Sequence, residues 1–345
     1  MLAAVFQGPG EMEVTEVETP EIGPDEVLVK VGANTICGTD VRIFRGEKTK
    51  GIPLPTILGH EMAGYVHQVG REVKGYEVGA PVAMAPVIAC RRCFYCQHDM
   101  ENLCLNQKIV GYDVKGGLSE YVRIPADAIA ARNLFVAQND LPSEYLALAE
   151  PLACCVNGQQ RSHIGLDSTV LIMGSGPIGL FHLQLSLLAG ARTVIVSDPS
   201  APRRAMASNF GAHITVDPTA EDLSAVVSQA TDDLGMDSII ICIGLPKLVN
   251  DALNLARQGG RINIFAGLSG QGWTEVEANL IHYKELEVTG TSNSRRSDYQ
   301  IALRLIESGR VKVEPMVTDR FPLRLVSEAL AKTASGEGIK VAVLP

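Results

Sequence analysis

The stretch that decides the fold is VLIMGSGPIG, at residues 170–179. Four apolar residues suited to a buried strand are followed directly by Gly174, Gly176 and Gly179, where a helix-like run begins. Glycines at this spacing allow a tight turn, a close approach of the backbone to a pyrophosphate, and close packing of helix on strand. The helix N-terminus would offer free N–H groups to the phosphate oxygens.

Strand-like and helix-like segments alternate around this motif. The expected strands are 170–173, 193–197, 214–216, 238–242 and 261–265, and the expected helices are 178–189, 202–210, 220–230 and 246–256. Repeated βαβ units with nearly uninterrupted apolar strands predict an α/β fold, in which helices cover both faces of a parallel sheet. This is the doubly wound architecture of a Rossmann domain.

Asp198 follows the second expected strand, about 20 residues after the glycines. A carboxylate there can accept hydrogen bonds from the adenosine ribose hydroxyls and would repel a 2′-phosphate, which favours NAD over NADP. Arg203 and Arg204 are close in sequence and leave NADP open, and the alternative to a cofactor site is a glycine-rich turn with Asp198 as a helix cap. We expect the cofactor contacts to come from Gly174, Gly176, Pro177, Ile178, Gly179, Asp198 and Arg203.

Length and composition indicate an ordinary globular protein. The chain has 345 residues, 46% hydrophobic and 20% charged, which is enough apolar material for two cores. Its net charge of −9 argues against nucleic acid as a partner, because that affinity comes mainly from Lys and Arg. The most apolar region, 170–191, is broken by glycines and a proline, so we expect no membrane span. The N-terminus lacks the pattern of a secretion signal, so we expect a cytoplasmic protein.

The rest of the chain differs from the Rossmann region in composition. Residues 1–150 contain short β-type runs separated by Gly- and Pro-rich turns, which predicts a mostly β domain. We assign residues 151–291 to the Rossmann domain. The tail at 292–345 holds one expected helix, Tyr299–Ser308, and a strand-like run at Lys340–Leu344. It is too short for a domain, and we expect it to return to the first one.

A four-cysteine run lies in the first domain. Cys90, Cys93, Cys96 and Cys104 form C-x2-C-x2-C-x7-C, and four thiolates can close a tetrahedral shell around a structural zinc. An iron–sulfur cluster is the main alternative, but a ferredoxin run places its fourth cysteine after three residues and then a proline. Here the gap is seven and Leu105 follows. The acidic chain argues against a nucleic-acid-binding zinc finger.

Two shorter motifs precede this run: ICGTD at residues 36–40 and GHE at 59–61. Each is weak alone, since a lone cysteine is usually a small core residue. With the four cysteines, AEPL at 149–152 and GSGPIG at 174–179, they make the chain resemble the zinc-containing medium-chain dehydrogenase/reductase family, in particular its polyol (sorbitol) dehydrogenase branch. The resemblance covers essentially the whole chain and implies a GroES-like catalytic domain beside the Rossmann domain.

The resemblance also implies residue roles. Cys37 and His60 would bind a catalytic zinc, with Glu61 as a third or movable ligand. Glu150 stands where the polyol branch has a Glu that binds the metal or its water, and the two glutamates are not ranked. Thr39 would contact the substrate oxygen and pass on its proton. Zinc would lower the pKa of the alcohol, and hydride would pass to the nicotinamide. We therefore expect two zinc ions per chain, and NAD as the cofactor.

Two segments depart from sorbitol dehydrogenases at positions that contact substrate there. They read Val41-Arg42-Ile43 and Ser292-Asn293-Ser294, so Asn293 becomes an expected substrate contact and sorbitol is not the expected substrate. Arg42 stands where some alcohol dehydrogenases have a relay histidine. Arginine stays protonated and cannot act as a base, so a proton relay must end elsewhere.

We expect an NAD-linked enzyme that oxidises a secondary alcohol of a polyol, cyclitol or sugar alcohol to a ketone. One alternative is an amino-alcohol dehydrogenase similar to threonine dehydrogenase, which shares ICGTD but tends to have Asp in place of Glu150. Another is a catalytically silent member that only binds NAD, which the intact set of metal ligands disfavours. The resemblance further suggests a homotetramer.

Overall fold

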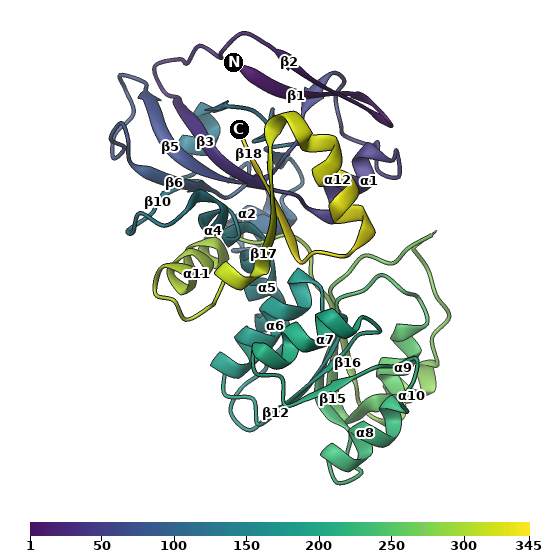
Figure 1. Ribbon diagram of the computed structural model, residues 1–345. Coiled ribbons are helices and arrows are strands. Elements are labelled where there is room, and N and C mark those ends of the chain that lie inside the picture. The colour runs from purple at the N-terminus through teal and green to yellow at the C-terminus, as the bar shows by residue number, and fades with distance from the viewer. Residues whose placement is uncertain (271) are drawn as a thin grey trace. The chain divides into compact units, whose positions relative to one another are not determined.

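The structure is a computed structural model that describes residues 1–270 and 272–345. It divides into two compact units (Figure 1). Unit 1 comprises Met1–Ala153 and Asn293–Pro345, and unit 2 comprises Cys154–Ser292. The first boundary falls inside one helix, α5 (Ala149–Ser162). The sequence pattern did not predict this helix, because it contains proline, glycine and asparagine, which are poor helix formers.

Unit 2 is built on a six-stranded, fully parallel sheet with the order β13-β12-β11-β14-β15-β16. Its strands are β11 (Thr169–Met173), β12 (Thr193–Ser197), β13 (Ile214–Val216), β14 (Met236–Ile241), β15 (Ala256–Ile264) and β16 (Glu287–Gly290). The chain starts in the middle of the sheet at β11, runs to one edge and then to the other. This is the doubly wound order of a Rossmann fold, so the predicted fold class is confirmed.

Helices cover both faces of this sheet. Leu171 and Met173 of β11 point into a core that includes apolar residues of α8, α9 and α10. Ile172, between them, points the other way, toward Gly179 of α6. The helices of this unit besides α5 are α6 (Pro177–Leu188), α7 (Ala201–Asn209), α8 (Leu223–Ala230), α9 (Leu248–Leu255) and α10 (Ala278–Tyr283).

Unit 1 is mostly β structure. Its largest sheet has the order β10-β6-β5-β3-β18-β17, with β9 also pairing with β3, and it is accompanied by the smaller sheets β2-β1-β4 and β7-β8. The strands are β1 (Leu2–Gly8), β2 (Glu11–Glu16), β3 (Val27–Thr35), β4 (Thr56–Ile57), β5 (Glu61–Val69), β6 (Pro81–Met84), β7 (Val87–Ile88), β8 (Lys108–Ile109), β9 (Tyr121–Ile124), β10 (Leu134–Val136), β17 (Val317–Pro322) and β18 (Lys340–Leu344). Because β18 pairs with β3, the end of the chain completes the sheet that the beginning started.

Short helices connect these strands. They are α1 (Gly38–Phe44), α2 (Phe94–Gln97), α3 (Ala126–Ala130), α4 (Ser143–Leu146), α11 (Arg296–Glu307) and α12 (Val326–Ser335), with 3-10 turns at Glu101–Leu103, Glu314–Met316 and Leu323–Leu325. The prediction of a single helix in the tail was wrong, since α12 follows α11. Val326, Ala329 and Leu330 of α12 are buried at helical spacing, but this apolar pattern is too short to stand out in the sequence.

Across the part of the chain that the structure describes, no helix combines the length and apolarity needed to cross a bilayer.

Candidate functional site

Three potential metal ligands come together in unit 1. One ligand atom each from Cys37, His60 and Glu61 lies within 4.8 Å of the other two. Cys37 is the N-cap of α1, Glu61 is the first residue of β5, and His60 directly precedes it. His60 and Glu61 are buried and Cys37 is half-buried. Thiolate, imidazole and carboxylate donors fit a zinc ion with three protein ligands and one open position.

Asp40 contacts both Cys37 and His60 and supports their positions. It is fully buried, and its Oδ2 accepts a hydrogen bond of 2.9 Å from the backbone N–H of Cys37. Its Oδ1 lies 3.4 Å from His60 Nδ1, an ion-pair distance, and neither atom has a hydrogen-bond partner among the described residues. A carboxylate at one ring nitrogen orients the histidine so that the other nitrogen can bind metal.

Glu61 is held by a buried cation. Lys340 of β18 donates to Glu61 Oε2 and also, at 3.2 Å, to the carbonyl oxygen of Ile36. The Thr35 hydroxyl donates to the same Glu61 oxygen. Burial opposes the charge on Lys340, but the Glu61 carboxylate outweighs burial and raises the pKa of Lys340. The lysine therefore keeps its proton and anchors one oxygen of Glu61.

Glu150 and Thr39 lie beside this cluster rather than in it. Glu150 is in the first turn of α5, only 9% exposed, and it is not one of the three clustered ligands. Its charge acts on Lys340, the partner of Glu61: burial lowers the pKa of Lys340, but Glu61 and, more weakly, Glu150 raise it. Thr39 is half-buried, and its N–H donates to Cys37 Sγ at 3.5 Å. The metal and substrate roles of Glu150 and Thr39 stay predictions.

Two other residues singled out in the sequence are not part of the cluster. Asn293 Nδ2 donates to the carbonyl oxygen of Asn102 at 3.4 Å, so its role as a substrate contact stays a prediction. Arg42 is exposed, with its Nε 3.8 Å from Glu47.

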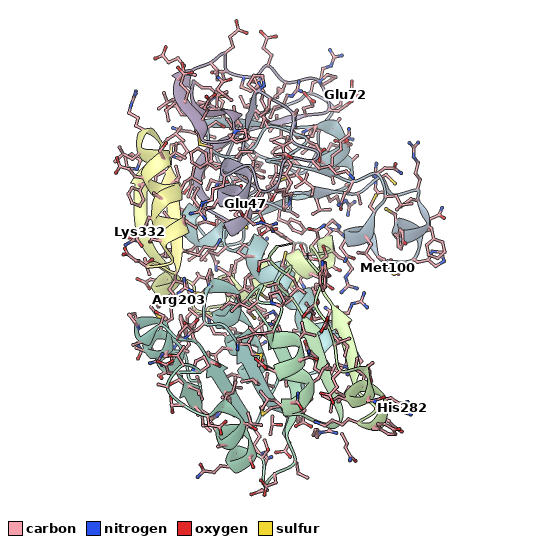
Figure 2. All side chains as sticks on the ribbon, turned by 90° about the vertical axis from the view of Figure 1, so that its right-hand side faces the viewer. Glu47, Glu72, Met100, Arg203, His282 and Lys332 are labelled. Carbon is pink, nitrogen blue, oxygen red and sulfur yellow. The ribbon has the colours of Figure 1, made fainter. Side chains whose placement is uncertain are left out.

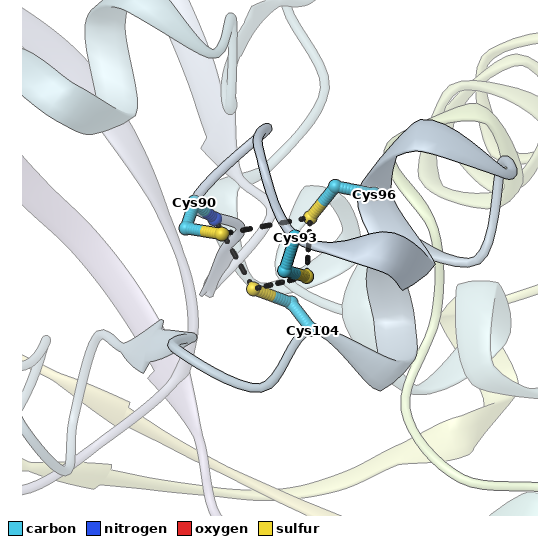
Figure 3. A group of neighbouring side chains, drawn as sticks. All are labelled: Cys90, Cys93, Cys96 and Cys104. Atoms are coloured by element: carbon cyan, nitrogen blue, oxygen red, sulfur yellow. Dashed lines mark hydrogen bonds between the residues drawn. The ribbon is translucent and has the colours of Figure 1, made fainter.

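The four cysteines form a second cluster in unit 1 (Figure 3). The Sγ–Sγ distances are 3.5 Å for Cys93–Cys96, 3.9 Å for Cys93–Cys104 and 4.0 Å for Cys90–Cys96. The backbone N–H of Arg92 is the main cause that lowers the pKa of Cys90 to about 6, whereas burial raises the pKa of Cys96 to about 12. Metal binding would convert all four thiols to thiolates. Four sulfur donors fit a closed zinc shell. Figure 2 labels Met100, which lies in the same lobe between Cys96 and Cys104.

The glycine motif forms the β11–α6 turn of unit 2. Gly174 has a φ of +104°, which side chains rarely allow, and Gly176 is the N-cap of α6. A Cβ on Gly179 would clash with the carbonyl oxygen of Gly174. Pro177 and Ile178 start the helix, where a fixed φ and a missing N–H are tolerated. The helix N-terminus is thus open to an anion.

Asp198 lies at the carboxyl end of β12, next to this turn. Its Oδ2 accepts a hydrogen bond of 2.8 Å from Ser175 N–H, and its Oδ1 accepts one of 2.8 Å from Ser200 N–H. A carboxylate has about four acceptor positions, so the backbone contacts leave acceptor capacity for a diol. Arg203 approaches the motif from α7, with Nη1 3.8 Å from where a Cβ of Gly176 would be.

Arg204 is occupied within the protein. Its Nη1 donates to the carbonyl oxygen of Asp198 at 2.7 Å and lies 3.1 Å from Asp217 Oδ2. Hydrogen bonds from Thr219, followed by the charge of Arg204, lower the pKa of Asp217, so this carboxylate stays ionised at neutral pH.

A cavity of about 490 Å³ opens in unit 2 at the carboxyl ends of the strands. Apolar side chains from Met173, Ile243 and Leu248 line it, with the acidic Glu221 and Asp251 among the other lining residues. Ligands of doubly wound sheets bind at this edge.

Sequence reasoning missed the supporting residues Asp40, Lys340 and Thr35. Asp40 had a signal, because an acid three residues after Cys37 forms a capping box with the N-cap. Lys340 had one as well, since a lysine in the otherwise apolar run IKVAVL must find a partner if the strand is buried. Thr35 had none.

Comparison with known families decides the identity. Residues 23–133 match the family described as alcohol dehydrogenase GroES-like domain, and residues 177–308 match the family described as zinc-binding dehydrogenase. D-arabitol-phosphate dehydrogenase of Enterococcus avium is 35% identical over 98% of this chain and 95% of its own length. The chain belongs to the zinc-containing medium-chain dehydrogenase/reductase family. It is an oxidoreductase of the alcohol dehydrogenase type, as the motifs indicated.

Two further relatives bear on substrate and cofactor. L-threonine 3-dehydrogenase of Thermococcus kodakarensis is 36% identical over 96% of this chain and 94% of its own length. A crystal structure of a candidate zinc-binding dehydrogenase from Sinorhizobium meliloti 1021, bound to NADP, superposes with a TM-score of 0.92 at 36% identity. It covers 100% of this chain and 99% of that chain. The relatives of this dehydrogenase thus differ in substrate, and one of them holds NADP.

Proposed function

We propose that this dehydrogenase transfers a hydride from a secondary alcohol of a polyol, cyclitol or sugar alcohol to NAD, giving a ketone. The observation that carries the proposal is the cluster of Cys37, His60 and Glu61, which presents a catalytic zinc donor set in a unit of the alcohol dehydrogenase type. Glu150 beside the cluster is the residue that the polyol branch uses.

The residues around the cluster position the metal ligands and transfer the proton of the alcohol. When bound, zinc supplies a Lewis acid that lowers the pKa of the alcohol. Asp40 keeps His60 in the orientation and tautomer for metal binding. Lys340 donates a hydrogen bond to one oxygen of Glu61, which orients this glutamate as the third metal ligand. Thr39 would accept the alcohol proton as it passes its own hydroxyl proton on to water, and Glu150 would orient the reacting hydroxyl.

The four-cysteine lobe would hold a second, structural zinc. Its Cys90, Cys93, Cys96 and Cys104 thiols leave no position open, so this ion stabilises the lobe and takes no part in the reaction.

Unit 2 supports NAD rather than NADP as the cofactor. When bound, NAD would supply the hydride acceptor, and Asp198 would accept hydrogen bonds from its adenosine ribose. A 2′-phosphate beside Asp198 would need a cation, and Arg204 is already paired with Asp217. Arg203 stands beside Gly176 of the phosphate-binding turn, where it can neutralise the pyrophosphate. A comparison of kcat/KM for NAD and NADP tests this, and the Asp198→Ala variant should narrow the preference.

A threonine-like amino alcohol is the second candidate substrate. The 36% identity to L-threonine 3-dehydrogenase over nearly the whole chain favours it, whereas Glu150 favours the polyol. The two substrates differ in their amino group, so a panel of polyols, inositols, sugar alcohols and L-threonine, followed by NADH absorbance, separates them.

We further propose a homo-oligomer, a tetramer, in the cytoplasm. The edge strand β16 supports association, because Val288 on it and Tyr283 just before it are exposed, at 39% and 76%. None of the described cysteines forms a disulfide bond, which suits a reducing compartment. Sedimentation of the purified protein gives the oligomeric state.

Paired variants test the catalytic centre. Glu61→Ala should lose zinc from the catalytic site, whereas Glu150→Ala should keep substantial zinc and lose most turnover. Zinc content and kcat are measured for both. Zinc lost only from Glu150→Ala would exchange the two roles, and full activity in both variants would remove the glutamates from the mechanism.

A further inference from the structure

Lys48 is a cation close to the candidate metal centre that neither the fold nor the proposed reaction uses. It follows α1 in the loop next to Glu47, which Figure 2 labels, and its backbone N–H donates to the carbonyl oxygen of Arg42 at 3.3 Å. Its Nζ lies 4.1 Å from the centre of the Tyr112 ring. The Tyr112 ring in turn contacts His60, with 5.1 Å between ring centres. Only one aromatic ring therefore separates the ammonium group from a metal ligand.

Among the described residues, no carboxylate pairs with the charge of Lys48. The side chain is half-buried, and burial lowers the pKa of Lys48 although nearby acidic groups oppose this. Within residues 1–270 and 272–345, no carboxylate oxygen lies within ion-pair distance of its Nζ. A cation over an aromatic face gains only about 0.5–1 kcal/mol where water still reaches it.

The neighbouring carboxylates are committed elsewhere. Asp40 serves the Cys37 N–H and His60, as described above. Asp113 Oδ2 accepts a hydrogen bond of 2.9 Å from the Ile109 N–H. Glu47, the neighbour in sequence, lies 3.8 Å from Arg42. These three carboxylates thus lie near Lys48 in the fold or in the sequence, but none of them forms an ion pair with it.

An anion from outside the chain would complete this arrangement. We propose that Lys48 binds an anionic group of the substrate, a phosphate or a carboxylate, while the reacting alcohol lies at the Cys37–His60–Glu61 cluster. The substrate class is then a polyol phosphate or a hydroxy acid rather than a neutral polyol. Lysine suits this role as a mobile point charge with three donors. The inference rests on the proposed function, because it assigns the second binding group of the same substrate.

The test uses three variants of the full chain. Lys48→Met removes the charge and keeps an unbranched stem over Tyr112. Lys48→Arg keeps the charge. Lys50→Met is the matched control, because Lys50 lies in the same loop, is exposed and makes no ion pair within the described residues. Melting temperatures confirm that the variants fold.

The first readout is binding by calorimetry. A pentitol phosphate, the same pentitol without phosphate, an aldonate and L-threonine are titrated into each protein. The wild type should bind at least one anionic compound about tenfold or more tightly than the neutral pentitol, in line with a charged hydrogen bond. Lys48→Met should lose most of that factor, while Lys48→Arg and Lys50→Met keep it. The anion that loses affinity identifies phosphate or carboxylate as the recognised group.

The second readout is NADH formation from the same compounds. The loss in Lys48→Met should appear mainly in KM, with the neutral pentitol changed less than about twofold. Equal affinity of wild type and Lys48→Met for all anionic compounds, or a wild-type preference for the neutral pentitol, would overturn the role of Lys48. Absence of NADH with every compound would instead overturn the proposed function, since the binding experiment reports on Lys48 independently.

Discussion

Replacing Lys340 by methionine isolates the buried ion pair behind the candidate metal centre. Lys340 and Glu61 are 4% and 1% exposed, and the lysine comes from the last strand of the chain while the glutamate comes from β5. Methionine fills nearly the same volume without the charge. The substitution therefore leaves the buried Glu61 carboxylate without its lysine, with the Thr35 hydroxyl and, when bound, the catalytic zinc as its partners.

The expected cost is large for a single substitution. Removing one partner of a buried pair typically destabilises a protein by 3–5 kcal/mol, because the other charge stays desolvated. The hydrogen bond from Thr35 offsets part of this, so we expect about 3 kcal/mol. For a unit of this size, that corresponds to a fall in melting temperature of about 6–12 °C.

Calorimetry of the purified protein measures this difference. Lys332→Met is the matched control, since Lys332 is a more exposed lysine, 2.9 Å from Glu337, and exposed pairs contribute about 0–1 kcal/mol. Adding Glu61→Gln to Lys340→Met removes the stranded charge and should recover more than half of the loss. If Lys340→Met melts within about 2 °C of Lys332→Met, the pair does not stabilise the centre as argued.

Three further predictions concern other parts of the chain. Cys96→Ser should reduce bound zinc by one equivalent and lower the melting temperature, whereas Cys154→Ser, a thiol outside both clusters, should do neither. Gly179→Ala should weaken NADH binding at least about tenfold by fluorescence titration, because its Cβ meets backbone, while Gly267→Ala, with open space around it, should bind as the wild type does. Burial lowers the pKa of His182 to about 3. Below about pH 6.5 this histidine is therefore protonated in the unfolded state but stays neutral in the folded state. Stability should therefore fall as pH drops from about 6.5 toward 3, by up to about 1.4 kcal/mol per pH unit, and urea unfolding of His182→Leu should show a shallower decline; equal slopes would contradict this.

Much of unit 2 could be predicted from the sequence, because its rules are local. The strand β12 was predicted with its observed bounds, because a short apolar run between two turns in a βαβ series indicates a buried strand. The helix α5 was missed because its stability comes from burial rather than from propensity, with Leu152 and Cys155 fully buried. The pairing of β18 with β3 joins the two ends of the chain, and no local pattern specifies such a distant partner.

The same division applies to the candidate site. The four cysteines could be found from their spacing, because metal ligands need particular residue types at particular separations. Cys37 and His60 could be assigned only through the resemblance to the family, since a lone cysteine or histidine is usually a structural residue. The sequence could not show which of Glu61 and Glu150 joins the metal cluster. The position of Glu61 depends on Lys340, which lies 279 residues from it in the chain. Lys48 was missed for a similar reason: its contact with Tyr112 exists only in the folded protein.

The most direct test of the central claim is NADH formation by wild type and Cys37→Ser on the polyol, polyol phosphate and threonine panel. The wild type should reduce NAD with at least one of these secondary alcohols. Cys37→Ser, at an unchanged melting temperature, should lose one equivalent of zinc and at least about a thousandfold in kcat, since the metal's contribution is several kcal/mol. Wild-type turnover in the Cys37→Ser protein would contradict a catalytic zinc at this cluster.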